Sequence, residues 1–203
     1  MSAAMDYKPT AEQVRRLREE TGVGIIDCRN ALARASGDYE AAKCDLHEQG
    51  SAKAAKKQER AANEGLVGSY IHAGGKIGVL LELNCETDFV ARNERFKELM
   101  RDISMHIAAM SPQYLDRAAV PAAAVEEVKR EFRASAPAGK PENVIEKIVE
   151  GKLNKWYEER VLLEQPFVKD DAQTIAELIA SAVGVLGENI QVRRYAKFTL
   201  GEQ

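Results

Sequence analysis

The hydrophobic pattern of the sequence changes its period abruptly near position 85. Before that point, apolar residues occupy every second position, at Ile77, Val79, Leu81 and Leu83. After it, they recur every three or four positions, at Phe96, Leu99, Met100, Ile103, Ile107 and Met110. A period of two is typical of a strand with one buried face, and the longer period is typical of an amphipathic helix. The chain is therefore expected to turn a rigid strand-to-helix corner over residues 84–93.

The tip of this corner carries residues that allow two interpretations. Thr87 or Asp88 is well placed to cap the helix, because a short side-chain oxygen accepts hydrogen bonds from the free amides of a first turn. Phe89 precedes Phe96 by about two helical turns, nearly in phase with the apolar stripe. Since large apolar residues are usually buried, the residues alone favour a place for Phe89 in the core. The alternative is that the corner presents Asp88 and Phe89 to a partner.

The first 50 residues predict three short helices. A capping box at Thr10 and Gln13 is expected to open the first helix. Glycines, which adopt the left-handed conformation that ends helices, are expected to stop the three helices in turn, at Gly22, Gly37 and Gly50. Three helices of this length form a bundle too small to bury much apolar surface.

Ile25 and Ile26 are adjacent at the start of the second predicted helix. One helix cannot direct two consecutive side chains at the same core, so one of the two is a candidate for a surface contact. The alternative is that neighbouring helices cover both edges of a wide apolar stripe.

The rest of the chain predicts a small sheet with helices. Residues 66–72 and 77–84 are expected to form a hairpin around the glycine-containing turn at 73–76. Residues 190–200 alternate in the same way and are mostly apolar on one face. We expect the three strands to pair into an antiparallel sheet covered by helices, which places the fold in the α+β class.

The predicted organisation has three parts. An N-terminal three-helix domain covers residues 1–50, and an α+β core domain covers residues 64–203. Residues 51–63, which are rich in Ala, Lys and Gln, are expected to form a solvated helical linker between them. The alternative for the linker lysines is electrostatic steering of an acidic partner.

Composition argues against several classes of protein. The chain has 29 Lys and Arg against 32 Asp and Glu, a net charge of −3, which gives no nucleic-acid footprint. No apolar run approaches the roughly 20 residues that span a bilayer. The three widely spaced cysteines argue against a disulfide framework or a zinc site and fit a reducing cytoplasm. With no phosphate-binding loop and no metal-ligand spacing, we expect no bound cofactor, metal or nucleotide.

Two further classes stay open from the residues alone. One is a thiol enzyme, with Cys85 as nucleophile and His72 on the neighbouring strand, although nothing in the sequence activates this thiol. The other is a nucleic-acid or ribosome binder built on the three-helix domain. A near-neutral charge and 6% aromatic residues supply neither the phosphate-neutralising charge nor the stacking platforms that such binding needs.

Several motifs carry a resemblance to a known family. Residues 17–32 read LREETGVGIIDCRNAL, residues 83–93 read LNCETDFVARN, residues 165–170 read QPFVKD and residues 187–190 read GENI. In this order, they resemble the signatures of the bacterial translation elongation factor Ts, in its short, single-core form. The resemblance covers nearly the whole chain.

The resemblance implies a function in translation elongation. Elongation factor Ts is the guanine nucleotide exchange factor of the GTPase elongation factor Tu, and it makes and breaks no bonds. Its partner-binding motif would lie here at Thr87, Asp88, Phe89, Val90, Ala91, Arg92 and Asn93, with Asp88 and Phe89 intruding to disturb the Mg²⁺ site of the GTPase. The N-terminal helices would resemble the ubiquitin-associated fold and dock on the GTPase through Leu17, Ile25 and Ile26.

The resemblance also bears on assembly and location. Long members of the family have a duplicated core and an inserted coiled coil, whereas this sequence has one core and no heptad run. As in other short members, we expect a homodimer in which the sheets of two copies replace the missing duplication. We expect a cytoplasmic protein that binds neither a membrane nor nucleic acid directly.

Overall fold

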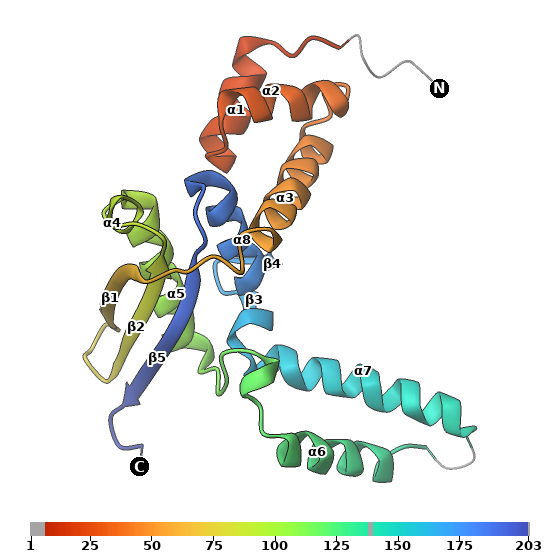
Figure 1. Ribbon diagram of the computed structural model, residues 1–203. Helices are drawn as coiled ribbons and strands as arrows, with labels where there is room; N and C mark the ends of the chain where they lie inside the picture. Colours follow the sequence, from red (N-terminus) through yellow and green to blue (C-terminus); the bar gives the residue numbers. More distant parts are fainter. Residues whose placement is uncertain (1–6, 138–139, 203) are drawn as a thin grey trace. The chain divides into compact units, whose positions relative to one another are not determined.

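The structure is a computed structural model that describes residues 7–137 and 140–202 (Figure 1). Three helices come first: α1 (Ala11–Thr21), α2 (Ile25–Arg34) and α3 (Tyr39–Ala55). A hairpin of β1 (Glu64–Ile71) and β2 (Ile77–Cys85) leads into the short helix α4 (Asp88–Ala91) and the long helix α5 (Glu94–Met110). The remaining elements are η1 (Arg117–Ala119), α6 (Ala122–Ala134), α7 (Glu142–Arg160), η2 (Leu162–Glu164), β3 (Pro166–Phe167), β4 (Asp170–Thr174), α8 (Ile175–Leu186) and β5 (Gln191–Thr199).

By its internal contacts, the chain divides into two units. Unit 1 consists of the chain up to Leu66 with Leu83–Leu99 and Glu177–Gln191, and unit 2 consists of Val67–Glu82, Met100–Ala176 and the chain from Val192. The division runs through β1, β2 and α5, so it separates halves of elements rather than consecutive stretches of sequence. The division into residues 1–50, 51–63 and 64–203 stays a prediction.

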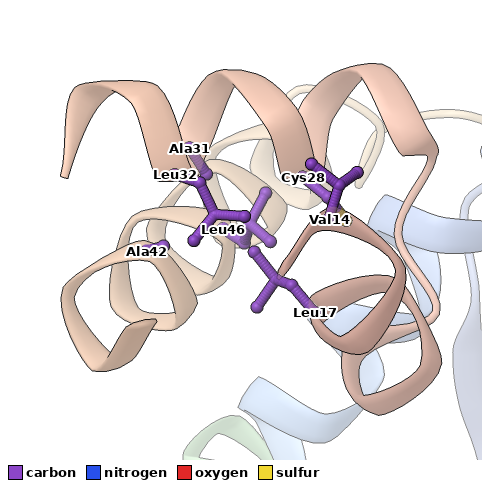
Figure 2. Close-up of a cluster of buried hydrophobic side chains, with 7 residues drawn as sticks. All are labelled: Val14, Leu17, Cys28, Ala31, Leu32, Ala42 and Leu46. Carbon is purple, nitrogen blue, oxygen red and sulfur yellow. The ribbon is translucent and has the colours of Figure 1, made fainter. Parts of the chain in front are cut away.

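The N-terminal helices enclose a small apolar core (Figure 2). Its buried side chains come from all three helices: Val14, Leu17, Cys28, Ala31, Leu32, Ala42 and Leu46. The predicted capping box is confirmed, since the Thr10 side chain accepts from the Gln13 backbone amide, and Gly22, with φ 71°, is the left-handed cap that ends α1. Helix α2 ends at Arg34, before two left-handed residues, Ser36 with φ 51° and the predicted Gly37 with φ 87°. These local signals set the start and the end of α1 and the end of α2, and the three helices pack together by burying one apolar stripe each.

The predicted stop at Gly50 is wrong, because α3 continues to Ala55. A Cβ placed on Gly184 of α8 would lie 3.1 Å from the Cα of Gly50, closer than side-chain atoms normally pack. The close approach of the two helices within unit 1 therefore needs a glycine at position 184, and Gly50 lies at this crossing rather than at a helix end. The Ala- and Lys-rich residues that follow have high helix propensity and carry the helix on.

The sheet has the predicted three strands, in the order β1–β2–β5, and the chain is an antiparallel α+β fold. The hairpin closes with the His72 amide donating to the Ile77 carbonyl oxygen, and Gly74 and Gly75 supply positive φ at its turn. The central strand β2 buries one face as its alternation predicts: Val79, Leu81, Leu83 and Cys85. In unit 2, Gly68 on β1 leaves room for Met100 of α5, since a Cβ there would meet the methionine sulfur at 2.1 Å.

The last strand departs from the pattern of its apolar residues. Val192 is buried, but farther along the same face the apolar side chains of Ala196 and Phe198 are exposed. The opposite face of this half of the strand carries the partly buried Tyr195, whose hydroxyl donates to the carbonyl oxygen of Pro112 at 2.9 Å. In this half of β5, the face with Tyr195 is therefore partly covered, and the face with Ala196 and Phe198 is exposed.

Helices α6 and α7 of unit 2 pair into a hairpin. At its base, Arg117 binds Glu164 through two nitrogens, at 2.5 and 2.6 Å, and its guanidinium lies 4.3 Å from the ring centre of Tyr157. Within the described ranges, no helix has the length and apolarity needed to cross a bilayer.

Candidate functional site

The predicted corner is present, but it contains two helices instead of one. Thr87 is extended and its side-chain oxygen accepts from the Val90 amide at 3.5 Å, so Thr87 caps the four-residue helix α4. The chain restarts at Asn93, whose side-chain oxygen accepts from the Arg95 amide at 3.0 Å and whose carbonyl oxygen accepts from the Lys97 amide at 3.1 Å. This is the bonding of a residue that opens a helix, and α5 begins directly after it.

The break at Asn93 explains the position of Phe89. Because α4 and α5 are separate helices, Phe89 is out of phase with the buried stripe that begins at Phe96. The side chain of Phe89 is 82% exposed, whereas Phe96 is fully buried. The core interpretation of Phe89 is therefore wrong: the ring lies at the surface of unit 1, on the tip of the corner.

Some neighbours of Phe89 pack inward and hold α4 in place, and others are accessible to solvent. Ala91 is 3% exposed and fixes α4 to the interior, and Val90 is partly buried. The Asp88 carboxylate binds the Arg92 guanidinium at 2.8 Å, one turn along; the Arg92 side chain is largely exposed and that of Asp88 is half exposed. The motif thus presents an acid, an aromatic ring and a base on one short turn.

Cys85 holds the base of the corner and is not a nucleophile. Its buried Sγ donates to the carbonyl oxygen of Thr87 at 3.1 Å. Burial, with a smaller effect of the nearby Glu188 carboxylate, raises the pKa of the Cys85 thiol to about 11, which keeps it protonated at neutral pH. His72 lies beyond the opposite end of β2, where its ring bonds the Tyr70 hydroxyl. The thiol-enzyme hypothesis is therefore wrong.

Glu188, which follows α8, contacts the corner directly. One carboxylate oxygen accepts from the amides of Glu86 and Thr87, at 3.1 and 2.9 Å, and the other accepts from the Thr87 hydroxyl at 2.6 Å. No role for Glu188 was predicted from the sequence. The only available signal was its place in the GENI motif, since about a hundred residues separate Glu188 from the residues that it binds.

The N-terminal candidates lie in two different environments of the helical bundle. Ile25 and Ile26 are both on the surface, 54% and 65% exposed, so neighbouring helices do not cover them. Leu17 is fully buried in the core of Figure 2 and offers no surface to a partner. The expectation that Leu17 contacts a partner directly is therefore corrected, because the apolar stripe of α1 faces the core of the bundle.

A groove beside Ile25 is lined by several arginines that were not predicted from the sequence to form a site. Arg15, Arg18, Arg29 and Arg95 line it, and Arg95 comes from the first turn of α5. Arg15 pairs with Glu19 at 2.8 Å. The groove therefore joins the first turn of α5 and the N-terminal helices of unit 1 in one partly basic surface.

The described residues bring together no group of three or more His, Cys, Asp or Glu side chains able to hold a metal ion. The exposed features of the site are instead an aromatic ring, two isoleucines and several charges. Their arrangement suits contact with another protein.

Comparisons with known proteins agree with this interpretation. The family model described as "Elongation factor TS" matches residues 40–202. The elongation factor Ts of Geobacter sulfurreducens is 56% identical over 95% of this chain and 90% of its own length. Those of Fervidobacterium nodosum and Coprothermobacter proteolyticus are 54% and 51% identical, over 95% of this chain and 98% of theirs.

Proposed function

Because the chain belongs to the elongation factor Ts family and so serves nucleotide exchange on the GTPase elongation factor Tu in translation elongation, we propose that its strand-to-helix corner opens the nucleotide site of that GTPase. An exchange factor makes and breaks no covalent bonds. A translation factor acts in the cytoplasm, as predicted from the sequence. The motif Thr87–Asn93 supplies the intruding surface, and Ile25 and Ile26 supply a second contact.

The thermodynamics of exchange require that the factor and GDP oppose each other. A factor that weakens GDP binding is itself weakened by GDP to the same extent. Each tenfold loss of GDP affinity therefore needs about 1.4 kcal/mol of additional interaction between factor and GTPase. Since GDP is held largely through Mg²⁺ and the phosphate-binding loop, a side chain that displaces elements around the ion uses this energy effectively.

The observation that carries the proposal is the exposure of Phe89. An aromatic ring 82% open to solvent, on a capped four-residue helix, has a large apolar surface that only another molecule can bury. Asp88 and Arg92, which bind each other, flank the ring and add polar contacts. Ala91 acts as the inward anchor, and Thr87 and Asn93 set the ends of the turn.

The N-terminal surface supports docking rather than intrusion. Ile25 and Ile26 provide exposed apolar area, and the adjacent groove with Arg18, Arg29 and Arg95 is complementary to an acidic partner surface. Leu17 contributes by keeping the bundle folded. Separate docking and intruding parts predict that variants affect affinity and maximal rate differently.

Release of fluorescent GDP from elongation factor Tu, followed at rising concentrations of the factor, tests the proposal. Phe89→Ala is expected to lower the maximal release rate by about tenfold or more, because a truncated interface aromatic typically costs 1–2 kcal/mol or more. The variant is expected to stay folded, since the ring is not part of the core. Phe132→Ala, which removes a partly buried ring from α6 of unit 2, is the control for loss of an aromatic side chain and is expected to retain the wild-type rate.

Two results would contradict the proposal. One is a Phe89→Ala protein that releases GDP at the wild-type maximal rate. The other is a Phe89→Ala protein that unfolds while its folded fraction keeps full activity, as a core residue would behave.

We further propose a homodimer formed through the open face of the sheet. In unit 2, large apolar side chains from all three strands are exposed: Val67, Ile71, Leu80, Phe198 and, just past β5, Leu200. A shallow groove runs among Ile71, Leu80 and Phe198. A contiguous apolar face of this kind is unfavourable in water, and a second copy of the same sheet covers it with a matching surface.

Sedimentation of wild type and Phe198→Asp tests the dimer. A carboxylate within the apolar face is expected to dissociate the dimer, because it would be buried without a partner. Val168→Asp, at an exposed aliphatic position of unit 2 outside the three-stranded sheet, is the control and is expected to leave the dimer intact. Wild type that sediments as a monomer at working concentration, with full exchange activity, would remove the dimer proposal.

A further inference from the structure

The loop after α8 is bonded to the base of the corner in unit 1, and we infer that Glu188 is a positioning residue for nucleotide exchange. In this inference, which rests on the proposed role of Phe89, Glu188 fixes Thr87 and thereby the orientation of α4 and its exposed ring. Glu188 does not touch the GTPase in this role. It acts through the backbone and side chain that it binds.

The Glu188 carboxylate uses both of its oxygens on the corner. It accepts from two consecutive amides, those of Glu86 and Thr87, and from the Thr87 hydroxyl. These amides belong to residues between β2 and α4, and the carboxylate pairs them in the absence of a strand partner. Hydrogen bonds to an ionised acceptor are about twice as strong as neutral ones, so this contact has the strength to order a short segment.

The Thr87 hydroxyl links this contact to Phe89. It donates to Glu188 at 2.6 Å and accepts from the Val90 amide at 3.5 Å. Donation to the carboxylate leaves an oxygen lone pair directed at the helix, which is the requirement for a cap. Glu188, Thr87 and Val90 therefore form one chain of hydrogen bonds that ends on the residue next to Phe89.

The loop that carries Glu188 is itself fixed. Gly187 is left-handed, with φ 80°, and ends α8: its backbone amide donates a hydrogen bond to the Val183 carbonyl oxygen at 3.0 Å. Asn189 is 3% exposed, and its side-chain nitrogen donates to the carbonyl oxygen of Arg60 at 2.7 Å. The Asn189 amide donates to the Glu86 carboxylate at 2.7 Å. The two segments thus hold each other through reciprocal bonds, each accepting from a backbone amide of the other.

Because α4 is so short, its conformation depends on these hydrogen bonds between Glu188 and the corner. A helix of four residues is far below the length at which a helix is stable alone, so its conformation is set by its cap and its attachment. Without Glu188, Phe89 samples several orientations, and only a fraction of them suits insertion. The rate of the step in which Phe89 inserts into the GTPase is then lower, while docking through Ile25 and Ile26 is unaffected.

The test compares maximal rate with half-saturating concentration in the GDP-release titration. Glu188→Ala is expected to lower the maximal rate by roughly tenfold. Losing hydrogen bonds to a charged group is expected to reduce the fraction of molecules with Phe89 in the inserting orientation by at least this factor. Its half-saturating concentration is expected to change by less than about twofold, within the scatter of a surface substitution. Glu188→Gln is expected to recover most of the rate, because its amide oxygen still accepts from both backbone amides.

Two further measurements separate positioning from general destabilisation. In a Phe89→Ala background, Glu188→Ala is expected to have no additional effect on the maximal rate, because the group through which it acts is gone. Hydrogen exchange at the amides of Glu86 and Thr87 is expected to become faster in Glu188→Ala and to stay slow in Glu188→Gln. Glu164→Ala, which removes a carboxylate with two bonds to Arg117 in unit 2, is the matched control and is expected to leave exchange activity unchanged.

The outcomes distinguish this inference from the function on which it rests. An inactive Phe89→Ala with a fully active Glu188→Ala overturns the role of Glu188 alone. Equal slowing by Glu188→Ala in both backgrounds also overturns it, since Glu188 would then act elsewhere. A fully active Phe89→Ala overturns the proposed function. If Glu188→Ala does not fold, Glu188→Asp repeats the test: its carboxylate is one methylene short of the amides, and a wild-type maximal rate for it contradicts the inference.

Discussion

The Nε2 atom of His106 lies 3.0 Å from the Oε1 atom of Gln165 in the interior of unit 2, with both side chains fully buried. The other ring nitrogen, Nδ1, accepts from the Val168 amide at 3.2 Å. A nitrogen that accepts from an amide carries no proton, so the ring is neutral and Nε2 donates to Gln165. Gln165 in turn donates to the Glu159 carbonyl oxygen at 2.8 Å. This network fixes one tautomer of His106.

The network predicts that unit 2 loses stability in mild acid. Burial lowers the pKa of His106 in the folded protein below its ordinary value of 6.5. Between the two pKa values the unfolded chain therefore binds more protons than the folded one, so the free energy of unfolding is fully retained above about pH 6.5 and decreases as pH falls. One proton contributes a slope of at most about 1.4 kcal/mol per pH unit. Urea unfolding between pH 7.5 and 5 measures this slope.

His106→Gln supplies the control for the pH dependence. The variant keeps a hydrogen-bonding side chain at the site but has no proton to gain, so this part of the slope is expected to vanish. Identical slopes in wild type and variant would mean that the acid sensitivity comes from other groups.

The two glycines at the crossing of α3 and α8 predict opposite responses to the same substitution. A Cβ on Gly50 would lie 3.7 Å from the Ala180 carbonyl oxygen, an ordinary contact, so Gly50→Ala is expected to gain up to about 1 kcal/mol from helix propensity. A Cβ on Gly184 would press on the Gly50 Cα at 3.1 Å, a backbone atom that yields only if a helix moves. Overpacking costs about 1–3 kcal/mol, so Gly184→Ala is expected to lose stability. Thermal unfolding of both variants ranks them, and equal melting temperatures would argue against a tight crossing.

The features predicted correctly from sequence depend on interactions between near neighbours. The capping box at Thr10, the left-handed Gly22 and the alternation along β2 involve residues within a few positions of each other, and their physics is the same in any fold. The cap at Thr87 was predicted for the same reason. The second helix start, at Asn93, was missed because an asparagine in a helical pattern looks like an ordinary surface residue. Only the structure shows that its side-chain oxygen accepts a hydrogen bond from the Arg95 backbone amide.

The features that were missed depend on contacts distant in sequence. The crossing of α3 and α8 depends on the contact between Gly50 and Gly184, and the hold on Thr87 depends on Glu188. Likewise, the partly covered face at the end of β5 carries Tyr195, whose hydroxyl bonds the Pro112 carbonyl oxygen 83 residues earlier. Periodicity reports that a strand has an apolar face. It does not report whether that face meets a helix, a second chain or solvent.

The environments of the three cysteines predict a large difference in reactivity. Cys44 is exposed, whereas Cys28 and Cys85 are buried and burial raises the pKa of both thiols. With a pKa of about 11, Cys85 is on the order of one part in a thousand thiolate at pH 8. Brief treatment of the folded protein with iodoacetamide is therefore expected to modify Cys44 alone, as read by peptide mass spectrometry. Urea is expected to expose all three, and modification of Cys85 at the rate of Cys44 without urea would contradict the buried thiol.

The separation of core from surface in the N-terminal helices predicts two distinct kinds of variant. Leu17→Ala removes a fully buried side chain from a core of seven residues and is expected to cost about 2–5 kcal/mol of stability. Ile26→Ala truncates a side chain that is 65% exposed, so its stability is expected to stay within about 0.5 kcal/mol of wild type. If Ile26 docks on the GTPase, the half-saturating concentration for GDP release is expected to rise about fivefold or more, as loss of an interface contact of 1 kcal/mol requires, with the maximal rate retained. Val168→Ala, which truncates a 46% exposed aliphatic side chain in unit 2, is the control. An Ile26→Ala protein with an unchanged titration curve would remove this residue from the docking surface, whatever the behaviour of Phe89.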